Sequence, residues 1–123
     1  MRRTLLVLAT LAAASYCRAE PPPPQQKATQ SAGQRLFQRW CAPCHNAGPG
    51  DDGMEMPPGT AALAAKYKGA VPAELERRGD LSADALRNFI RHGSGSMPMF
   101  RRTEVSDADI EELARYLKET SAR

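Results

Sequence analysis

The sequence has few of the residues from which β-sheets are built. Beyond residue 19 it contains only two valines and two isoleucines, namely Val71, Val105, Ile90 and Ile110. β-Branched residues favour strands, whereas the Leu, Ala, Glu and Arg residues that are plentiful here favour helices. The composition therefore predicts an all-α domain and argues against folds built on a sheet.

The sequence also lacks a hydrophobic run long enough to span a membrane, which takes about 20 residues. Its longest apolar stretch covers residues 5–14. Arg2 and Arg3 precede this stretch, and small residues follow it at positions 17 and 19. This order is typical of a secretory signal peptide, so we expect cleavage after Ala19, export to the periplasm and no stable membrane insertion afterwards. The alternative is a leader that stays attached as a membrane anchor.

An excess of positive charge is missing from the rest of the chain. The whole sequence carries 17 Lys and Arg residues against 14 Asp and Glu residues. Three of the arginines lie within residues 1–19, so the remainder carries 14 charges of each sign. The charge balance therefore gives no support for nucleic-acid binding.

Proline and glycine divide the remainder into a tether and one domain. Residues 20–30 include four consecutive prolines and polar residues, which predict a disordered, extended tether. Residues 31–121 form the expected domain. Its first helix carries an apolar face, with Gly33, Leu36, Phe37 and Trp40 at helical spacing. A Gly- and Pro-rich loop is expected over residues 46–59.

Three further helices are expected after this loop. Thr60 is the predicted N-cap of a short helix over residues 61–68. Ser82 and Ser106 are the predicted N-caps of helices over residues 83–91 and 107–119. The former is expected to turn three side chains inward: Leu86, Phe89 and Ile90.

Cysteine is scarce as well. One of the three, Cys17, lies in the expected leader, where lipid modification is an alternative that bulky Tyr16 disfavours. The other two, Cys41 and Cys44, would enter an oxidising compartment, in which a free pair would normally form a disulfide. The pair must therefore be a disulfide, part of a metal site or a point of covalent attachment.

The two cysteines lie in the segment Cys41–His45, and its sequence CAPCH matches C-x-x-C-H, the attachment signature of haem c. Each thiol can form a thioether with one porphyrin vinyl group, and two intervening residues let both reach neighbouring groups. His45 then follows as an axial iron ligand. We expect its other ring nitrogen to donate to a backbone carbonyl, for which Pro57 and Pro58 are candidates.

Met97 is the candidate for the second axial ligand. It lies in the segment GSGSMPMF, whose small residues let a backbone pass close to a flat group. Ligation by His45 and Met97 would raise the reduction potential. Met99 is the reserve candidate and His92 a bis-histidine alternative, whereas Met54 and Met56 follow His45 too closely. Both Met97 and Met99 could instead simply fill the core.

Three other interpretations compete with a six-coordinate haem. The sequence WCAPC, ending at Cys44, also resembles the active site of thioredoxin-like thiol oxidoreductases, which would use Cys41 and Cys44. That site follows a buried strand, for which this chain lacks the residues, and leaves His45 unexplained. A zinc site needs about four ligands, and only His92 would remain. A five-coordinate haem, without Met97, would suit a sensor or peroxidase.

These motifs resemble class I cytochromes c over residues 32–118. The resemblance rests on Gly33, Phe37, the segment Cys41–His45, Met97-Pro98 and a last helix with Leu113, Tyr116 and Leu117. It implies a fold of short helices around one covalently bound haem, with the first and last helices crossing at Gly33 and Phe37. The stretches LRNFIRHGSGSMPMF and VSDADIEELARYL are also similar to cytochrome subunits of flavocytochromes such as 4-cresol dehydrogenase, although the acidic, methionine-containing loop over 46–58 departs from the family pattern.

The resemblance implies a one-electron carrier rather than an enzyme, with redox proteins as partners and a periplasmic dehydrogenase, a flavoprotein, as donor. The chain would then be a free carrier or the electron-transfer subunit of a dehydrogenase complex. Four arginines around the Met97 segment could steer an acidic partner, neutralise the haem propionates or form a solvated basic face: Arg87, Arg91, Arg101 and Arg102.

Overall fold

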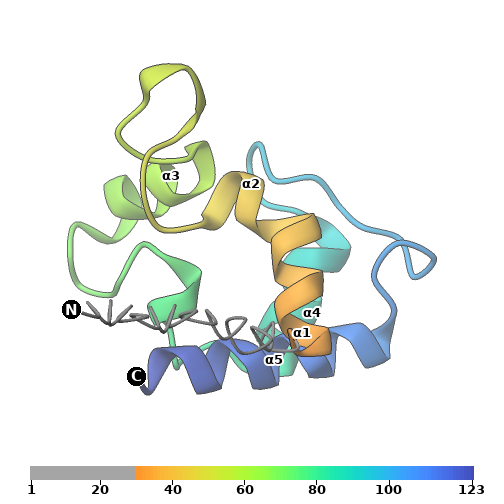
Figure 1. Cartoon of the computed structure of the whole chain (residues 1–123). Helices are drawn as coiled ribbons and strands as arrows, with labels where there is room; N and C mark the ends of the chain where they lie inside the picture. The colour runs from red at the N-terminus through yellow and green to blue at the C-terminus, as the bar shows by residue number, and fades with distance from the viewer. Residues whose placement is uncertain (1–29) are drawn as a thin grey trace, which may run out of the picture.

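The computed structural model describes residues 30–123, which form helices joined by loops (Figure 1). The elements follow in the order α1 (Ala32–Leu36), the π-helical turn η1 (Phe37–Cys41), α2 (Ala42–His45), the 3₁₀ turn η2 (Asp51–Gly53), α3 (Pro58–Tyr67), the 3₁₀ turn η3 (Leu75–Arg77), α4 (Ala83–His92) and α5 (Asp107–Ser121).

The all-α prediction is confirmed, because residues 30–123 contain no strand and only an isolated bridge between Ser94 and Met97. No helix in this part of the chain combines the length and apolar character that a membrane span requires. The expected leader, 1–19, and the expected tether, 20–30, lie outside the described residues except for Gln30.

The helix that carries the C-x-x-C-H segment changes its winding just before that segment. In a regular α-helix the ring of Pro43 would clash with the carbonyl of Arg39, four residues earlier. The turn η1 is wider, and it closes with a hydrogen bond from the N–H of Ala42 to the carbonyl of Phe37, five residues back. The π-helical turn therefore lets α1, η1 and α2 continue through Pro43 as one helical rod, which bends where α2 begins (Figure 1).

Helix α3 differs from the sequence prediction at both ends. It begins at Pro58 rather than after Thr60, because the fixed φ of proline suits a first helical turn that needs no N–H. Thr60 is therefore not a cap: its side chain is 2% exposed, and its hydroxyl donates to the carbonyl of Asn46 at 2.9 Å. The helix ends at Tyr67 because Lys68 takes a left-handed conformation with φ 49°.

The predicted caps of the last two helices are confirmed. The hydroxyl of Ser82 accepts from the N–H of Ala85, and Ser106 forms a capping box with Asp109. The prediction that Phe89 faces inward is wrong, since its side chain is 37% exposed. Phe89 lies about 100° around the helix from Ile90, so it points away from the side that packs on α5.

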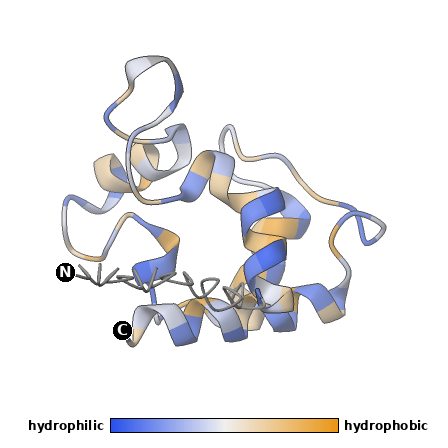
Figure 2. Cartoon of the chain, viewed as in Figure 1, coloured by the Kyte–Doolittle hydropathy of each residue, from blue (hydrophilic) through white to orange (hydrophobic). Residues whose placement is uncertain are grey.

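Helices α1 and α5 cross at Gly33, as the resemblance implied. A Cβ added to Gly33 would lie 2.3 Å from the carbonyl oxygen of Glu112 and 2.6 Å from Cβ of Tyr116, so only glycine allows this approach. The ring of Phe37 packs on that of Tyr116 at 5.7 Å between centroids. Figure 2 shows hydrophobic and hydrophilic residues alternating along both helices, as expected where one face of each is buried.

The buried apolar core is one-sided. Its members come from the first helical rod, α4, α5 and the position two residues before α5: Phe37, Ala42, Leu86, Ile90, Val105, Ile110, Leu113, Tyr116 and Leu117. Between α2 and α4 several large apolar side chains are only half-buried, including those of Leu63, Val71 and Leu75. The segment around α3 therefore holds apolar surface that a large apolar group could cover.

Candidate haem-binding site

The segment Cys41–His45 lies at the end of the first helical rod, where η1 passes into α2. The side chain of Cys41 is half-buried and that of Cys44 is exposed, and both are free thiols. Cys41 packs against the edge of the core, whereas the α2 turn leaves the Cys44 thiol at the surface of the domain, where a group could be attached.

The electrostatics of the cysteine pair do not suit thiol–disulfide chemistry. Burial, together with the nearby Cys44, raises the pKa of the Cys41 thiol to about 12. A thiol oxidoreductase needs a lowered cysteine pKa, because the thiolate is the attacking species. The helical fold also lacks the sheet on which thioredoxin-like sites are built. The thioredoxin-like interpretation therefore does not fit the described part of the chain.

His45 is suited to bind a metal ion. Desolvation by burial lowers its pKa, so the imidazole stays neutral at neutral pH, as a metal ligand must be. Its Nδ1 atom is buried and has no hydrogen-bond partner within residues 30–123. The side chain of His45 is therefore held in the protonation state of a metal ligand, and its Nδ1 atom takes no part in the hydrogen bonds that stabilise the described fold.

The backbone of α3 lies directly against the His45 ring. A Cβ added to Gly59 would lie 2.5 Å from Cε1 of His45 and 2.6 Å from the carbonyl oxygen of Cys44. The expected hydrogen bond from His45 to a carbonyl of Pro57 or Pro58 is not formed, so that prediction is wrong here. The Pro57 carbonyl instead accepts from the N–H of Ala61 at 2.9 Å, as the first bond of α3.

Met97 and Met99 differ in their surroundings. Met97 is half-buried and packs against the core, whereas the side chain of Met99 is 67% exposed. Two backbone hydrogen bonds join Met97 to Ser94, at 3.0 and 3.2 Å, and close a tight turn. Gly93 has φ +69°, and a Cβ on it would lie 2.5 Å from the Met97 carbonyl oxygen. The turn that presents Met97 therefore requires glycine at position 93.

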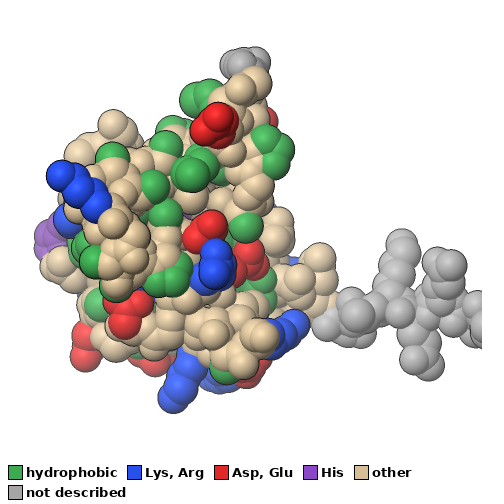
Figure 3. Space-filling view, turned by 90° about the vertical axis from the view of Figure 1, so that its left-hand side faces the viewer, with side chains coloured by type: hydrophobic (Ala, Val, Ile, Leu, Met, Phe, Trp, Pro, Cys, Tyr) green, Lys and Arg blue, Asp and Glu red, His purple; other side chains and the backbone are tan. Residues whose placement is uncertain are grey.

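The other sulfur and imidazole side chains are placed less suitably as ligands. Met54 and Met56 are 45% and 40% exposed, in the loop between η2 and α3. Figure 3 shows hydrophobic side chains spread over the face turned to the viewer, with acidic side chains near the tip of the upper projection of that face. His92 is exposed at the end of α4, and its Nδ1 atom donates to the Asn88 carbonyl at 2.9 Å.

An aromatic contact brings the two halves of the site together. The ring of Trp40, next to Cys41, packs edge-on against that of Phe100, with 5.8 Å between centroids and 73° between planes. Trp40, Cys41, Met97 and Phe100 all pack against the same core. The Met97 segment is thus held beside the C-x-x-C-H segment, although more than fifty positions separate them in the sequence.

Sequence reasoning missed one charged group near α3. The guanidinium of Arg78, a residue only 7% exposed, bonds both carboxylate oxygens of Asp80 and lies 5.0 Å from the centre of the Tyr67 ring. Hydrogen bonds from Arg78 lower the pKa of Asp80. Arg78 follows Arg77 in a charged run, and no local pattern distinguishes the buried arginine from its exposed neighbour.

These features fit a haem group: two thiols at the required spacing, a neutral imidazole with an unused nitrogen, a flanking apolar surface and a half-buried thioether. Together with the all-α fold and the crossing of α1 and α5, they define a class I c-type cytochrome.

Comparison with known proteins assigns the family. Residues 28–117 match the family model described as cytochrome c oxidase, cbb3-type, subunit III, and the chain belongs to this family. A cytochrome c6 from Cyanidium caldarium is 32% identical over 85 residues, which cover 69% of this chain and 65% of the relative. The match thus spans a little less than two thirds of that relative. No solved structure matches the chain significantly. The cofactor that the family implies is covalently bound haem c.

Proposed function

We propose that this protein is a periplasmic one-electron carrier in which Cys41 and Cys44 bind haem c through thioethers and His45 and Met97 are the axial ligands. The observation that carries the proposal is the half-buried His45 ring immediately after the cysteine pair, whose Nδ1 atom has no hydrogen-bond partner within residues 30–123, together with the half-buried Met97 held alongside by the Trp40–Phe100 contact.

The residues have separate tasks in this mechanism. When bound, haem supplies an iron that alternates between the ferric and ferrous states. Cys41, at the end of η1, and Cys44, in α2, would fix the group to the first helical rod, and Gly59 lets α3 support the His45 ring. With His45 and Met97 as ligands, no position is left for a substrate, so the protein transfers electrons instead of catalysing a reaction. The apolar surroundings limit the access of water and so influence the potential.

Covalent attachment can be tested on the purified protein. A pyridine haemochrome spectrum and an intact mass should report one haem per chain, bound through two thioethers. Cys41→Ala or Cys44→Ala should leave at most one thioether and change the haemochrome band. A colourless protein with a reducible Cys41–Cys44 disulfide would instead support thiol chemistry.

The axial role of Met97 has a matched control two residues away. Met97→Ala should abolish the near-infrared charge-transfer band of thioether-ligated ferric haem and allow the ferrous protein to bind carbon monoxide rapidly. Met99→Ala should leave both properties unchanged, since Met99 is mostly exposed. If the unmodified protein already binds carbon monoxide rapidly, the position is open, and a sensor or peroxidase role would replace electron transfer.

Export and domain organisation belong to the same proposal. We propose that residues 1–19 are a cleaved signal peptide, that residues 20–30 are a tether and that residues 31–121 form the cytochrome domain. The intact mass of exported protein should correspond to a chain starting at Glu20. A lipid adduct at Cys17, or retention of the leader in the membrane fraction, would contradict cleavage after Ala19.

The proposed electron donor is a periplasmic flavoprotein dehydrogenase. The proposal rests on the similarity of the segments around Met97 and Ser106 to cytochrome subunits of flavocytochromes. A reduced flavoprotein that oxidises alkylphenols should reduce the ferric cytochrome faster than its free flavin does at the same concentration. Equal rates with protein and free flavin would contradict a specific donor of this class.

A further inference from the structure

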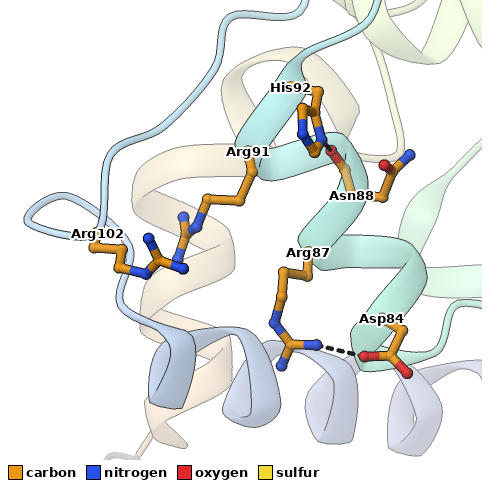
Figure 4. A pocket seen from close by; sticks show the side chains of 6 residues that line it. All are labelled: Asp84, Arg87, Asn88, Arg91, His92 and Arg102. Carbon is orange, nitrogen blue, oxygen red and sulfur yellow. Dashed lines mark hydrogen bonds and ion pairs between the residues drawn. The ribbon is translucent and has the colours of Figure 1, made fainter.

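One pocket of the described residues lies along α4 and not at the cysteine pair. It has a volume of about 470 Å³ and is lined by Asp84, Arg87, Asn88, Arg91, His92 and Arg102 (Figure 4). Such a group of arginines could be read as an anion site.

The guanidinium groups around this pocket already have partners. Arg87 bonds Asp84 on its own helix and Glu111 on α5, the latter at 2.8 Å. Arg102 donates to Asp107 at 3.0 Å. Because each positive charge is matched by a carboxylate, the cluster cross-links α4, α5 and the chain between them, and it offers little net charge to an anion.

Arg91 is the most buried of these arginines, with 13% of its side chain exposed. Its Nη1 atom donates to the carbonyl of Phe100 at 3.1 Å, and its Nη2 atom donates to the carbonyl of Val105 at 2.8 Å. Nη2 also lies 2.8 Å from Oδ1 of Asp107. One planar guanidinium thus holds both ends of the segment that joins the Met97 turn to α5.

The Met97 segment is fixed on its other side as well. The N–H of Phe100 donates to the carbonyl of Ile90 at 2.7 Å, and the carbonyl of Phe100 accepts from the Arg91 side chain. Both backbone polar groups of Phe100 are therefore bound by residues of α4. The backbone pairing of Ser94 with Met97 fixes the preceding turn. Only Pro98 and Met99 separate Met97 from the point that Arg91 holds.

We propose that Arg91 is the positioning residue for Met97: it clamps the carbonyls of Phe100 and Val105 and so holds the thioether of Met97 on the iron. This inference rests on the proposed axial role of Met97. Arg91 itself touches neither Met97 nor the haem site in the contacts described, and it acts through the backbone. Asp107 completes the clamp by orienting the guanidinium.

Lysine cannot replace this arrangement. The guanidinium presents several N–H donors in a fixed plane, whereas an ammonium group is a single point charge on a flexible stem. Arg91→Lys preserves the attraction to Asp107 but cannot span the two carbonyls in the same way. The comparison of Lys with Met at position 91 therefore separates the carbonyl clamp from the ion pair.

The clamp is tested by measuring whether Met97 is bound to the iron, and not only by measuring the stability of the fold. In Arg91→Met we expect the fraction of molecules with Met97 off the iron to rise about tenfold or more, in line with the loss of two charged hydrogen bonds to part-buried carbonyls. Faster carbon monoxide binding by the ferrous protein and a weaker near-infrared band in the ferric protein would report this rise. Arg91→Lys should behave similarly, and Asp107→Asn should show a smaller effect in the same direction.

Two controls separate positioning from general destabilisation. Arg115→Met makes the same chemical change at an arginine whose bond is to Glu112 on its own helix, and it should leave ligation unchanged. Leu117→Ala removes a core side chain that is 1% exposed, and it should lower the unfolding temperature without accelerating carbon monoxide binding at room temperature.

The possible results are distinct. If Met97→Ala retains the near-infrared band, the axial role of Met97 fails, and with it the premise of the clamp. If Met97→Ala loses the band while Arg91→Met, Arg91→Lys and Asp107→Asn all bind carbon monoxide at the wild-type rate, Met97 is the ligand but the clamp is refuted. If Arg91→Met does not fold, Arg91→Lys and Asp107→Asn decide the question.

Discussion

At the scale of single residues, Gly59 controls the support behind His45. Any side chain at this position would press on the imidazole and on the Cys44 carbonyl, and the backbone contact cannot be relieved by a rotamer change. The identity of residue 59 therefore matters to His45, the proposed axial ligand, although residue 59 has no chemistry of its own.

Gly59→Ala is expected to lower the free energy of unfolding by about 1–3 kcal/mol, as overpacking typically does, and to shift the reduction potential. Thermal unfolding and redox titration of the holoprotein measure the two effects. The matched control is Gly79→Ala, where the nearest atom to an added Cβ is the hydroxyl of Ser121 at 2.9 Å, which can rotate away. Equal effects of both substitutions would contradict a specific role for Gly59.

Tyr116 links the helix crossing to alkaline stability. Its side chain is buried, and its hydroxyl donates to Glu76 of η3. Burial and the hydrogen bond and charge of Glu76 raise its pKa to about 12, whereas an unfolded tyrosine has a pKa of about 10. Its contribution to stability is therefore complete below pH 10 and is lost as the pH rises toward 12.

Tyr116→Phe should consequently flatten the fall in unfolding temperature between about pH 10 and pH 12. Tyr67→Phe is the control, because the pKa shift of Tyr67 is opposite to that of Tyr116. A hydrogen bond with Arg78 lowers the pKa of Tyr67, so its ionisation does not oppose folding. A Tyr116→Phe profile that falls as steeply as that of the wild type would show that this tyrosine does not control alkaline unfolding.

At the scale of elements, the crossing of α1 and α5 depends on the absence of a side chain at Gly33. The built Cβ meets the Glu112 backbone at 2.3 Å, so a larger residue must separate two helices that share the core. Gly33→Ala is expected to destabilise the fold by about 1–3 kcal/mol even though alanine is the better helix former. Denaturant unfolding should show a lower midpoint, and a gain in stability would contradict the close crossing.

The sequence identifies the helices well where their signals are local. Ser82 and Ser106 cap α4 and α5 as predicted, since a cap involves only residues within one turn. Thr60 carries the same signal but lies inside α3, because Pro58 starts the helix earlier. The π-helical turn before Cys41 was not predicted, because it results from the demands of Pro43 on a helix that continues beyond it.

At the scale of the whole molecule, ion pairs compensate much of the charge. Hydrogen bonds from Arg91 and Arg102 lower the pKa of Asp107, and those from Arg78 lower the pKa of Asp80. A carboxyl whose pKa is lowered in the folded state adds stability above its unfolded pKa, near 3.9, and loses it as the pH falls through the folded value.

Acid unfolding should therefore become pronounced below about pH 4, and Asp107→Asn should reduce the steepness of this fall. The exposed Glu55, in the loop before α3, provides the control Glu55→Gln, because it has no ion pair within residues 30–123. Circular dichroism at a series of pH values measures both. An Asp107→Asn profile identical to that of the wild type would contradict the contribution of this network.

The sequence by itself indicated the cofactor and determined the fold class of this protein. The spacing of Cys41, Cys44 and His45 predicts haem attachment because the three groups lie within one helical turn, and the scarcity of Val and Ile determines the all-α class. Helical spacing and caps located the main helices for the same reason, since their interactions are local.

Only the tertiary structure distinguished side chains of one type by their surroundings. Met97 packs against the core while Met99 is exposed, and Arg91 and Arg78 are largely buried while Arg102 and Arg77 are not. The tertiary structure likewise determined the outward position of Phe89 and the hydrogen bond from the buried Thr60 to the Asn46 carbonyl. The physical reason is that burial and partners depend on which distant segments pack together, and neighbouring residues in the sequence do not encode this directly.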